Sequence, residues 1–185
     1  MTDTASACGS PDRRRRLIVV CGLSFAGKST LADALCAAFG HAQVDVDQTK
    51  DALYGPGVDD CDLNSAAWQR IYEETDRRTG DLLRDAASVV DGSRGFRRRE
   101  RDRARSLAES TGAEMVLIHV DTPEAVARRR WAANRAARTR RDVSEQAFEE
   151  IVAVMEPPAP DEGALVFRHG DNITRWLTEY AGDLR

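Results

Sequence analysis

The sequence predicts an α/β fold in which helices cover both faces of a doubly wound, five-stranded parallel sheet. Short apolar runs alternate along the chain with longer segments of helical periodicity, and this alternation is typical of parallel sheets. The 185-residue chain shows no internal repeat and no interior linker, and its 42% hydrophobic and 31% charged residues suit one globular domain. We therefore expect a single domain over residues 17–185 after a flexible tail over residues 1–16.

Each element is expected from its local pattern. The apolar runs predict strands at 17–21, 42–46, 88–90, 114–120 and 164–167. Helical periodicity predicts helices at 28–39, 48–53, 64–86, 97–111, 123–138, 144–155 and 173–182. Pro123 suits the first turn of its helix, Ser144 suits the cap of the next helix, and Pro157 ends that helix. Residues 54–63, YGPGVDDCDL, are expected to form a surface loop.

Composition excludes several classes of protein. No stretch approaches the roughly 20 apolar residues of a membrane span. The N-terminal arginine run is not followed by the long apolar segment of a secretory signal. The four cysteines form no C-x-x-C pair, which argues against a zinc site or a disulfide framework. We therefore expect a cytoplasmic protein with no membrane partner, and its oligomeric state is left open.

The segment GLSFAGKS fits the phosphate-binding pattern G-x-x-x-x-G-K-[ST] at every fixed position. A strand pattern precedes it and a helix pattern comes after it, so converging backbone N–H groups and a helix N-terminus should face the phosphates of a nucleotide. Lys28 should reach the β- and γ-phosphates as a catalytic residue, and Ser29 should bind Mg²⁺. The residues expected to contact the nucleotide are Gly22, Ser24, Phe25, Ala26, Gly27, Lys28, Ser29 and Thr30.

Two kinds of P-loop protein are disfavoured by the residues C-terminal to this motif. GTP switches read guanine with N-K-x-D, but the only later lysine is Lys50, in QTKDAL. ATP-driven motors usually place Asp-Glu at the end of a strand, the Glu activating water, whereas Asp91 is followed by Gly92. Asp91 is therefore a candidate magnesium ligand, and the missing glutamate favours transfer to an acceptor other than water.

The segment QVDVDQTKDALYG supplies a candidate catalytic base. Ligands gather at the carboxyl ends of parallel strands, and Asp47 would lie there, placed to accept the proton of a substrate hydroxyl. Lys50, on the same face if the helix starts at Asp47, is the candidate to bind a substrate anion or to orient Asp47. Asp45 is the rival base and a candidate to hold a magnesium-bound water. The alternative is that Asp47 caps the helix and Lys50 is solvated, although capping and catalysis can coexist.

Residues 124–156 are expected to form an arginine-rich helical lid. The segment ARRRWAANRAARTRRDVSEQ carries arginines at 128, 129, 130, 135, 138, 140 and 141. Such a lid would neutralise charge on a migrating phosphoryl group and exclude water. Arg135 and Arg138 are the candidate catalytic arginines, and Arg130 is a candidate substrate-binding residue. The alternative for any single arginine is a solvated position on a charged helix.

Together these motifs resemble small P-loop kinases similar to polynucleotide 5′-kinases and to AAA-type kinase-like ATP-binding proteins. The resemblance covers about residues 17–167 and rests on the phosphate loop, on Asp47 with a basic residue three positions on, on Asp91 and on the arginine-rich lid. It implies a P-loop NTPase fold of the nucleoside/polynucleotide-kinase type, with ATP and Mg²⁺ as cofactors. Two departures are Lys50, where the family usually has arginine, and the many lid arginines, which leave Arg138, Arg135 and Arg130 as equal candidates.

The resemblance further implies transfer of the γ-phosphoryl group to a hydroxyl, on a small molecule or on an RNA or DNA 5′ end. The alternative function is an ATP-binding regulatory protein that is non-catalytic or hydrolyses ATP slowly. The segment RGFRRRERDRAR would suit a polynucleotide backbone, but its interleaved Glu100 and Asp102 weaken that interpretation. The loop His169-Gly170-Asp171, after the last strand, is a candidate for the adenine side of the nucleotide site.

Overall fold

The computed structural model describes residues 14–85, 87–138 and 143–185. It confirms the expected five-stranded parallel sheet, whose strand order is β2-β3-β1-β4-β5. The strands are β1 (Arg16–Cys21), β2 (Ala42–Val44), β3 (Val89–Asp91), β4 (Glu114–Asp121) and β5 (Leu165–Arg168). The central strand β1 lies between β3 and β4, so the phosphate loop leaves the middle of the sheet.

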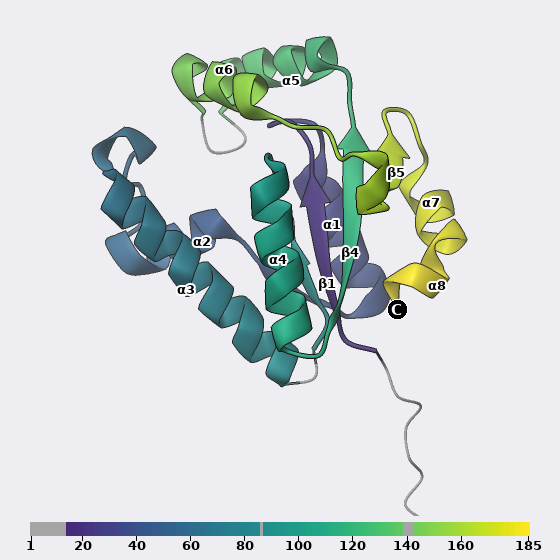
Figure 1. The fold of residues 1–185 in the computed structure, drawn as a ribbon. Helices are drawn as coiled ribbons and strands as arrows, with labels where there is room; N and C mark the ends of the chain where they lie inside the picture. Colours follow the sequence, from purple (N-terminus) through teal and green to yellow (C-terminus); the bar gives the residue numbers. More distant parts are fainter. Residues whose placement is uncertain (1–13, 86, 139–142) are drawn as a thin grey trace, which may run out of the picture.

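Helices cover both faces of this sheet and its upper edge (Figure 1). They are α1 (Lys28–Phe39), α2 (Val46–Tyr54), α3 (Ser65–Arg84), α4 (Arg98–Ser110), α5 (Glu124–Ala137), α6 (Glu145–Val154), α7 (Ile173–Glu179) and α8 (Ala181–Leu184). Two short 3₁₀ turns, η1 (Asp60–Asp62) and η2 (Pro160–Glu162), add to them. Helices α5 and α6 cross above the carboxyl ends of β1 and β4 (Figure 1).

The two faces of β1 bury two separate sets of apolar side chains. Ile18 and Val20 pack with residues of α1, α7 and α8, whereas Leu17 and Val19 pack with residues of α3 and α4. Because side chains alternate along a strand, a strand buried on both faces reads as a continuous apolar run. This explains why RLIVVC is buried along its whole length.

Several expected boundaries are wrong by a few residues. β2 ends at Val44, and α2 begins at Val46, two residues before the expected start. The helix cap is therefore Asp45 and not Asp47: the Asp45 carboxylate accepts hydrogen bonds from the backbone N–H of Asp47 at 2.7 Å and of Gln48 at 3.4 Å. The last expected helix is split between α7 and α8, and β1 already begins at Arg16.

Some expectations fall on residues outside the described part of the chain. These are the tail up to residue 13, the helix end at Ala86, and the lid arginines Arg140 and Arg141.

A buried ion pair fastens the segment after α6 to α4. The Arg101 side chain is fully buried, and its Nε and Nη2 donate to the two Glu162 oxygens at 2.6 and 2.8 Å. Its Nη1 donates to the carbonyls of Gly95 and Glu156, both at 2.9 Å. Every direction of the guanidinium fork is thus used, which is the arrangement a buried charge needs.

Removing one partner of this pair is expected to be strongly destabilising. Arg101→Met leaves the Glu162 carboxylate buried without its cation, which typically costs about 3–5 kcal/mol of unfolding free energy. Urea unfolding monitored by circular dichroism measures the loss. Arg98→Met is the matched control, because its pair with Asp161 is solvent-exposed and should change the midpoint little. Equal midpoint shifts in the two variants would contradict this account.

The same pair predicts a pH dependence. The hydrogen bonds from Arg101 hold the pKa of Glu162 below its usual value. A carboxyl with a lowered folded-state pKa adds stability that is fully present above its unfolded pKa of about 4.3 and is lost as pH falls through the folded pKa. Wild-type protein should therefore lose more unfolding free energy below about pH 4.3 than Glu162→Gln does.

Candidate active site

The phosphate loop turns sharply at positions that require glycine or a left-handed backbone. Gly22 has φ of 140°, and a Cβ there would lie 2.7 Å from the Val120 carbonyl oxygen. Gly27, which precedes the first residue of α1, has φ of 112°, and Phe25 between them has φ of 62°. The loop therefore curls around the N-terminus of α1, where backbone N–H groups can face an anion.

The side chain of Lys28 folds back over the phosphate loop. Its Nζ donates to the carbonyl oxygens of Gly22 and Leu23, both at 3.0 Å, and lies 5.0 Å from the centroid of the Phe96 ring. These partners are neutral, so a nucleotide phosphate would be a stronger partner for the ammonium group. Lys28 is thus held where its charge can be redirected to a phosphate.

A pocket of about 620 Å³ opens on the α5 side of the loop. Its walls include Phe25, Ala26, Gly27 and Thr30 from the loop and α1, Arg130 and Asn134 from α5, and His169, Gly170 and Asp171 from the turn after β5. The turn 169–171, which the sequence suggested for the adenine side of the nucleotide site, therefore lies beside the phosphate loop. A pocket of this size can hold the base and ribose of a nucleotide.

Arg130 lies on this nucleotide side of the loop. Its Nη1 donates to the carbonyl oxygens of Phe25 at 3.2 Å and Ala26 at 2.9 Å. These contacts place Arg130 beside the pocket next to the phosphate loop, and its expected role in binding the acceptor substrate stays a prediction.

The carboxyl ends of β2 and β3 are joined by a short hydrogen-bond chain. Val46 N donates to the Ser93 hydroxyl oxygen at 3.1 Å, and that hydroxyl donates to Asp91 at 2.8 Å. The turn that carries Asp45 and Asp47 is thus held beside the turn that carries Asp91. Asp47 itself is exposed at the start of α2, whereas one oxygen of Asp45 is occupied by the helix cap.

Asp91 is buried and ion-paired, which the sequence did not indicate. Only 1% of the residue is exposed, and Arg94 donates to one carboxylate oxygen through Nε at 2.8 Å and Nη2 at 2.7 Å. Arg94 also donates to Asp76 on α3 at 2.6 Å. Burial opposes the charge of Arg94, but Asp91 and Asp76 outweigh it and raise the pKa of Arg94.

The residues present suit a magnesium–nucleotide complex in the chemistry of their donors. Ser29 offers a hydroxyl at the start of α1, and Asp91 and Asp45 offer carboxylates at neighbouring strand ends. Mg²⁺ prefers oxygen ligands and usually takes one or two protein groups, with phosphates and waters supplying the rest. Within residues 14–85, 87–138 and 143–185 no cluster of three His, Cys, Asp or Glu forms a ready-made metal cage.

Lys50 does not lie where it was expected. The side chain is fully buried, and its Nζ donates to the Val58 carbonyl at 2.9 Å and to the Asp60 carboxylate. Asp47 and Lys50 are still three residues apart within α2, but the Lys50 side chain is turned into the protein, toward the loop between α2 and α3. In this structure it anchors that loop and is not solvated, and its binding of a substrate anion or orientation of Asp47 stays a prediction.

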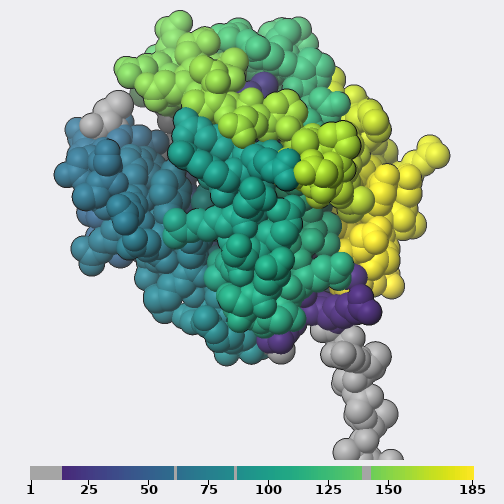
Figure 2. Space-filling view, viewed as in Figure 1, coloured from purple at the N-terminus to yellow at the C-terminus, as the bar shows by residue number. Residues whose placement is uncertain are grey.

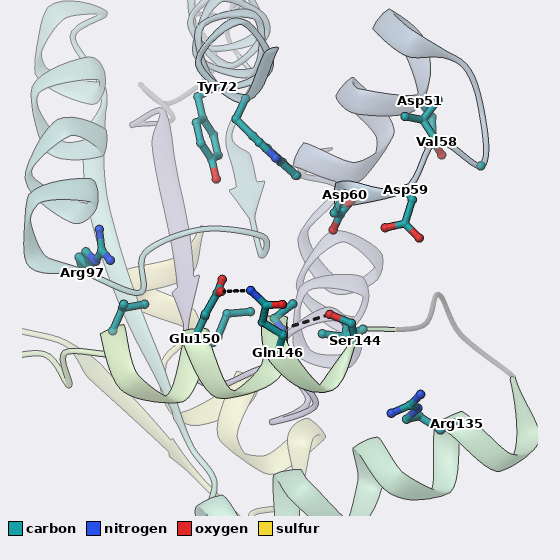
Figure 3. Close-up of a pocket in the computed structure, with 16 residues that line it drawn as sticks. Asp51, Val58, Asp59, Asp60, Tyr72, Arg97, Arg135, Ser144, Gln146 and Glu150 are labelled. Atoms are coloured by element: carbon teal, nitrogen blue, oxygen red, sulfur yellow. Dashed lines mark hydrogen bonds between the residues drawn. The ribbon is translucent and has the colours of Figure 1, made fainter. Parts of the chain in front are cut away.

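A larger hollow lies on the other side of the phosphate loop, between α3 and α6, and we call it the α3–α6 cleft. It measures about 1090 Å³. Trp68 and Tyr72 of α3 form one wall, Ala147 and Ile151 of α6 form part of the opposite wall, and the loop 57–60 closes one end. Figure 3 shows Tyr72 of α3, Asp59 and Asp60 of the loop, and Gln146 and Glu150 of α6 around this hollow, and Figure 2 shows the surface hollowed between the blue α3 region and the teal α4.

Tyr72 connects this cleft to the phosphate loop. It also lines a smaller pocket of about 420 Å³ that includes Asp91, Arg94 and Phe96, and Phe96 is the ring beside Lys28. Burial raises the pKa of Tyr72, and the charges of Glu100, Asp60 and Asp47 act in the same direction. The phenol therefore lies within electrostatic range of Asp47. Sequence reasoning missed Tyr72, Trp68 and Arg97 as site residues, and only the run RGFRRRERDRAR drew attention to Arg97.

The lid arginines have different surroundings. Arg135 lines the α3–α6 cleft and lies over the Trp131 ring at 5.4 Å. Arg128 pairs with Glu124 and Glu149 and so fastens α5 to α6. Arg138 is exposed and ends α5 with φ of 48°. Helices α5 and α6 therefore cover the site as a joined pair, and their movement as a lid stays a prediction.

Comparison with known proteins identifies the family. The model of the family described as AAA domain matches residues 17–158, so the chain belongs to this family. No curated protein is significantly similar to it in sequence. In the part of the chain that the structure describes, no helix is long and apolar enough to cross a bilayer.

Solved structures share the fold at low sequence identity. A Chloroflexus aurantiacus protein, provisionally classed as a kinase, superposes with a TM-score of 0.72 at 18% identity over 94% of this chain and 100% of its own. Chaetomium thermophilum Kti12 with ADP-AlF3 gives 0.71 at 17% identity over 91% and 98%. Mycobacterium tuberculosis APS kinase CysC with AMPPNP and APS gives 0.60 at 22% identity over 92% and 97%. The fold is therefore that of P-loop kinases.

Proposed function

We propose that the protein is an ATP- and Mg²⁺-dependent kinase that transfers the γ-phosphoryl group of ATP to a hydroxyl. The observation that carries this proposal is the position of Tyr72, which lines both the α3–α6 cleft and the pocket of Asp91 and Phe96 beside Lys28. A nucleotide on one side of the phosphate loop and an acceptor in the cleft would then meet at Lys28. The P-loop kinase fold and the absence of a glutamate after Asp91 support transfer over hydrolysis.

In the proposed reaction Asp47 is the base, and Lys28 and Arg135 are the cations. The acceptor hydroxyl oxygen forms a bond to the γ-phosphorus, and its proton passes to the exposed carboxylate of Asp47. The bond between the γ-phosphorus and the bridging oxygen breaks, and ADP leaves with the electron pair. Lys28 and Arg135 are the cations placed to balance charge on the migrating group. Mg²⁺, when bound with the nucleotide, neutralises phosphate charge.

The rival function is an ATP-binding regulatory protein that hydrolyses ATP slowly or not at all. Its support is that Asp91 is already paired with Arg94 and that an acceptor is not specified by the motifs. Incubation with γ-labelled ATP and a panel of small hydroxyl compounds and 5′-hydroxyl oligonucleotides separates the two functions. Label on an acceptor supports the kinase. Acceptor-independent release of phosphate, or ATP binding without turnover, supports the regulator.

Two of the arginines of α5, Arg130 and Arg135, are expected to affect different substrates. Arg130 contacts the nucleotide side of the phosphate loop, so Arg130→Ala should raise KM for ATP by about tenfold and leave KM for the acceptor within about twofold. Arg135 lines the opposite cleft, so Arg135→Ala should act on the acceptor KM or on kcat. Steady-state kinetics with each substrate varied in turn measures both. Effects of both variants on ATP alone would contradict the assignment of the two sides.

A further inference from the structure

We propose that the α3–α6 cleft binds a small hydroxyl compound that has an aromatic or similarly flat apolar body and no negative charge. This inference rests on the proposed kinase function and names the class of acceptor. The walls of the cleft and the charge of its lining carry the argument, and binding can be measured without turnover.

The first wall is a pair of aromatic side chains. Trp68 and Tyr72 lie one helical turn apart on α3, and their ring centroids are 5.9 Å apart. Tyr72 is 40% exposed, which is high for a large hydrophobic side chain among the described residues. In Figure 3 it points from α3 across the cleft toward α6. An aromatic side chain exposed inside a concave site offers a flat surface for stacking.

The second wall is an apolar face of α6 that lines the cleft. Phe148 on one side of α6 is buried against Trp131 of α5, with ring centroids 5.1 Å apart. Ala147, Ile151 and Val154 recur at helical spacing on the other side and line the cleft. They are only partly buried. Apolar side chains thus face aromatic ones across a space that suits a drug-sized molecule.

The charges of the lining give no excess of basic groups for an anionic acceptor. The described lining residues include four carboxylates and two guanidinium groups, namely Asp51, Asp59, Asp60, Glu150, Arg97 and Arg135, and Asp60 is paired with Lys50. A polynucleotide end brings a chain of phosphates, whose binding needs an excess of basic side chains. A flat apolar body is needed to cover Trp68 and Tyr72 on one wall and Ala147, Ile151 and Val154 on the other, and a small polyol such as glycerol lacks such a body. An uncharged or cationic aryl alcohol could stack on the aromatic wall and contact the apolar face of α6, and it would bring no negative charge into the cleft.

Intrinsic fluorescence tests the binding directly, since Trp68 lies in the cleft and Trp131 and Trp176 lie elsewhere. We expect 2-phenylethanol, titrated without ATP, to change the emission of wild-type protein saturably and that of Trp68→Phe little. Glycerol and a 5′-hydroxyl tetranucleotide should give no saturable change, and 3-phenyllactate should bind at least about tenfold more weakly than 2-phenylethanol. Saturable binding of the oligonucleotide would overturn the proposal. Absence of aryl alcohol binding would also overturn it, and would mean that α3 and α6 only pack against each other.

Variants of the cleft separate stacking from general damage. Tyr72→Ala should raise the dissociation constant of 2-phenylethanol about tenfold, whereas Tyr72→Phe, which keeps the ring, should restore it to within about twofold. Arg70→Ala, on the exposed side of the same helix, is the matched control and should leave binding unchanged. Equal effects of Tyr72→Ala and Arg70→Ala would remove the basis of the proposal.

The binding assay and the transfer assay fail independently. Aryl alcohol that binds in the cleft, while no compound of the acceptor panel is phosphorylated, would contradict the kinase function and leave the binding site standing. Phosphorylation of a sugar or an oligonucleotide, insensitive to Tyr72→Ala, would uphold the kinase function and overturn the aromatic acceptor.

Discussion

Lys28→Ala is expected to abolish phosphoryl transfer. Lys28 supplies the positive charge at the centre of the phosphate loop, and its Nζ is held over the loop by the Gly22 and Leu23 carbonyls. The only other lysine, Lys50, is buried in contact with Val58 and Asp60 and cannot replace it. Loss of one donor that stabilises developing charge typically lowers kcat by about 10²–10³-fold, and loss of a full charge should lower it at least as much. Single-turnover transfer from labelled ATP measures the effect.

The variant should nevertheless fold. The contacts of Lys28 with the Gly22 and Leu23 carbonyls and with the Phe96 ring are contacts with neutral groups, so their loss leaves no buried charge unpaired. Its melting temperature should stay close to wild type, which separates loss of chemistry from loss of structure. The matched control is Arg129→Ala, an exposed cation of α5 outside both pockets. Unchanged turnover in Lys28→Ala would refute the assignment of the phosphate loop.

The features that could be predicted from sequence are those fixed by neighbouring residues. The strand, the glycine turn and the helix around Lys28 are consecutive in the chain, so local geometry brings them together. The order of strands and helices along the chain is likewise set by alternating patterns, and the differences are shifted ends and the division of the last helix into α7 and α8. Asp45 caps α2 because its side chain can reach the N–H groups two and three residues on, and an expected strand that extended to Val46 hid that cap.

The features that could not be predicted depend on contacts between distant segments. Arg94 reaches Asp76 only because the turn after β3 packs against α3, whereas its pair with Asp91 joins residues three positions apart. In a chain with 25 arginines among 27 basic residues, no pattern distinguishes that arginine from its neighbours. The α3–α6 cleft is likewise formed by two helices that are far apart in sequence. From the sequence alone, Trp68 and Tyr72 are therefore indistinguishable from ordinary packing residues of a helix.

Asp47→Asn is expected to slow transfer and to leave ATP binding nearly unchanged. Asparagine keeps the size of the side chain but removes the charge and the proton acceptor. General-base catalysis typically contributes about 10²–10⁴-fold, so the single-turnover rate should fall by that order. The helix should remain intact, because the cap of α2 is formed by Asp45 and not by Asp47. Transfer and nucleotide binding are measured on the same preparation.

Asp45→Asn is the control, and its own result decides between the two carboxylates. Asparagine caps helices about as well as aspartate, so the hydrogen bonds to Asp47 N and Gln48 N should survive and the start of α2 should hold. If Asp47 is the base, Asp45→Asn keeps most of its transfer rate. If Asp45→Asn is inactive while Asp47→Asn is near wild type, the base is Asp45, which then acts through the oxygen that is not used for capping. If both variants transfer normally, neither carboxylate takes the proton. The kinase mechanism then has no general base at the carboxyl end of β2.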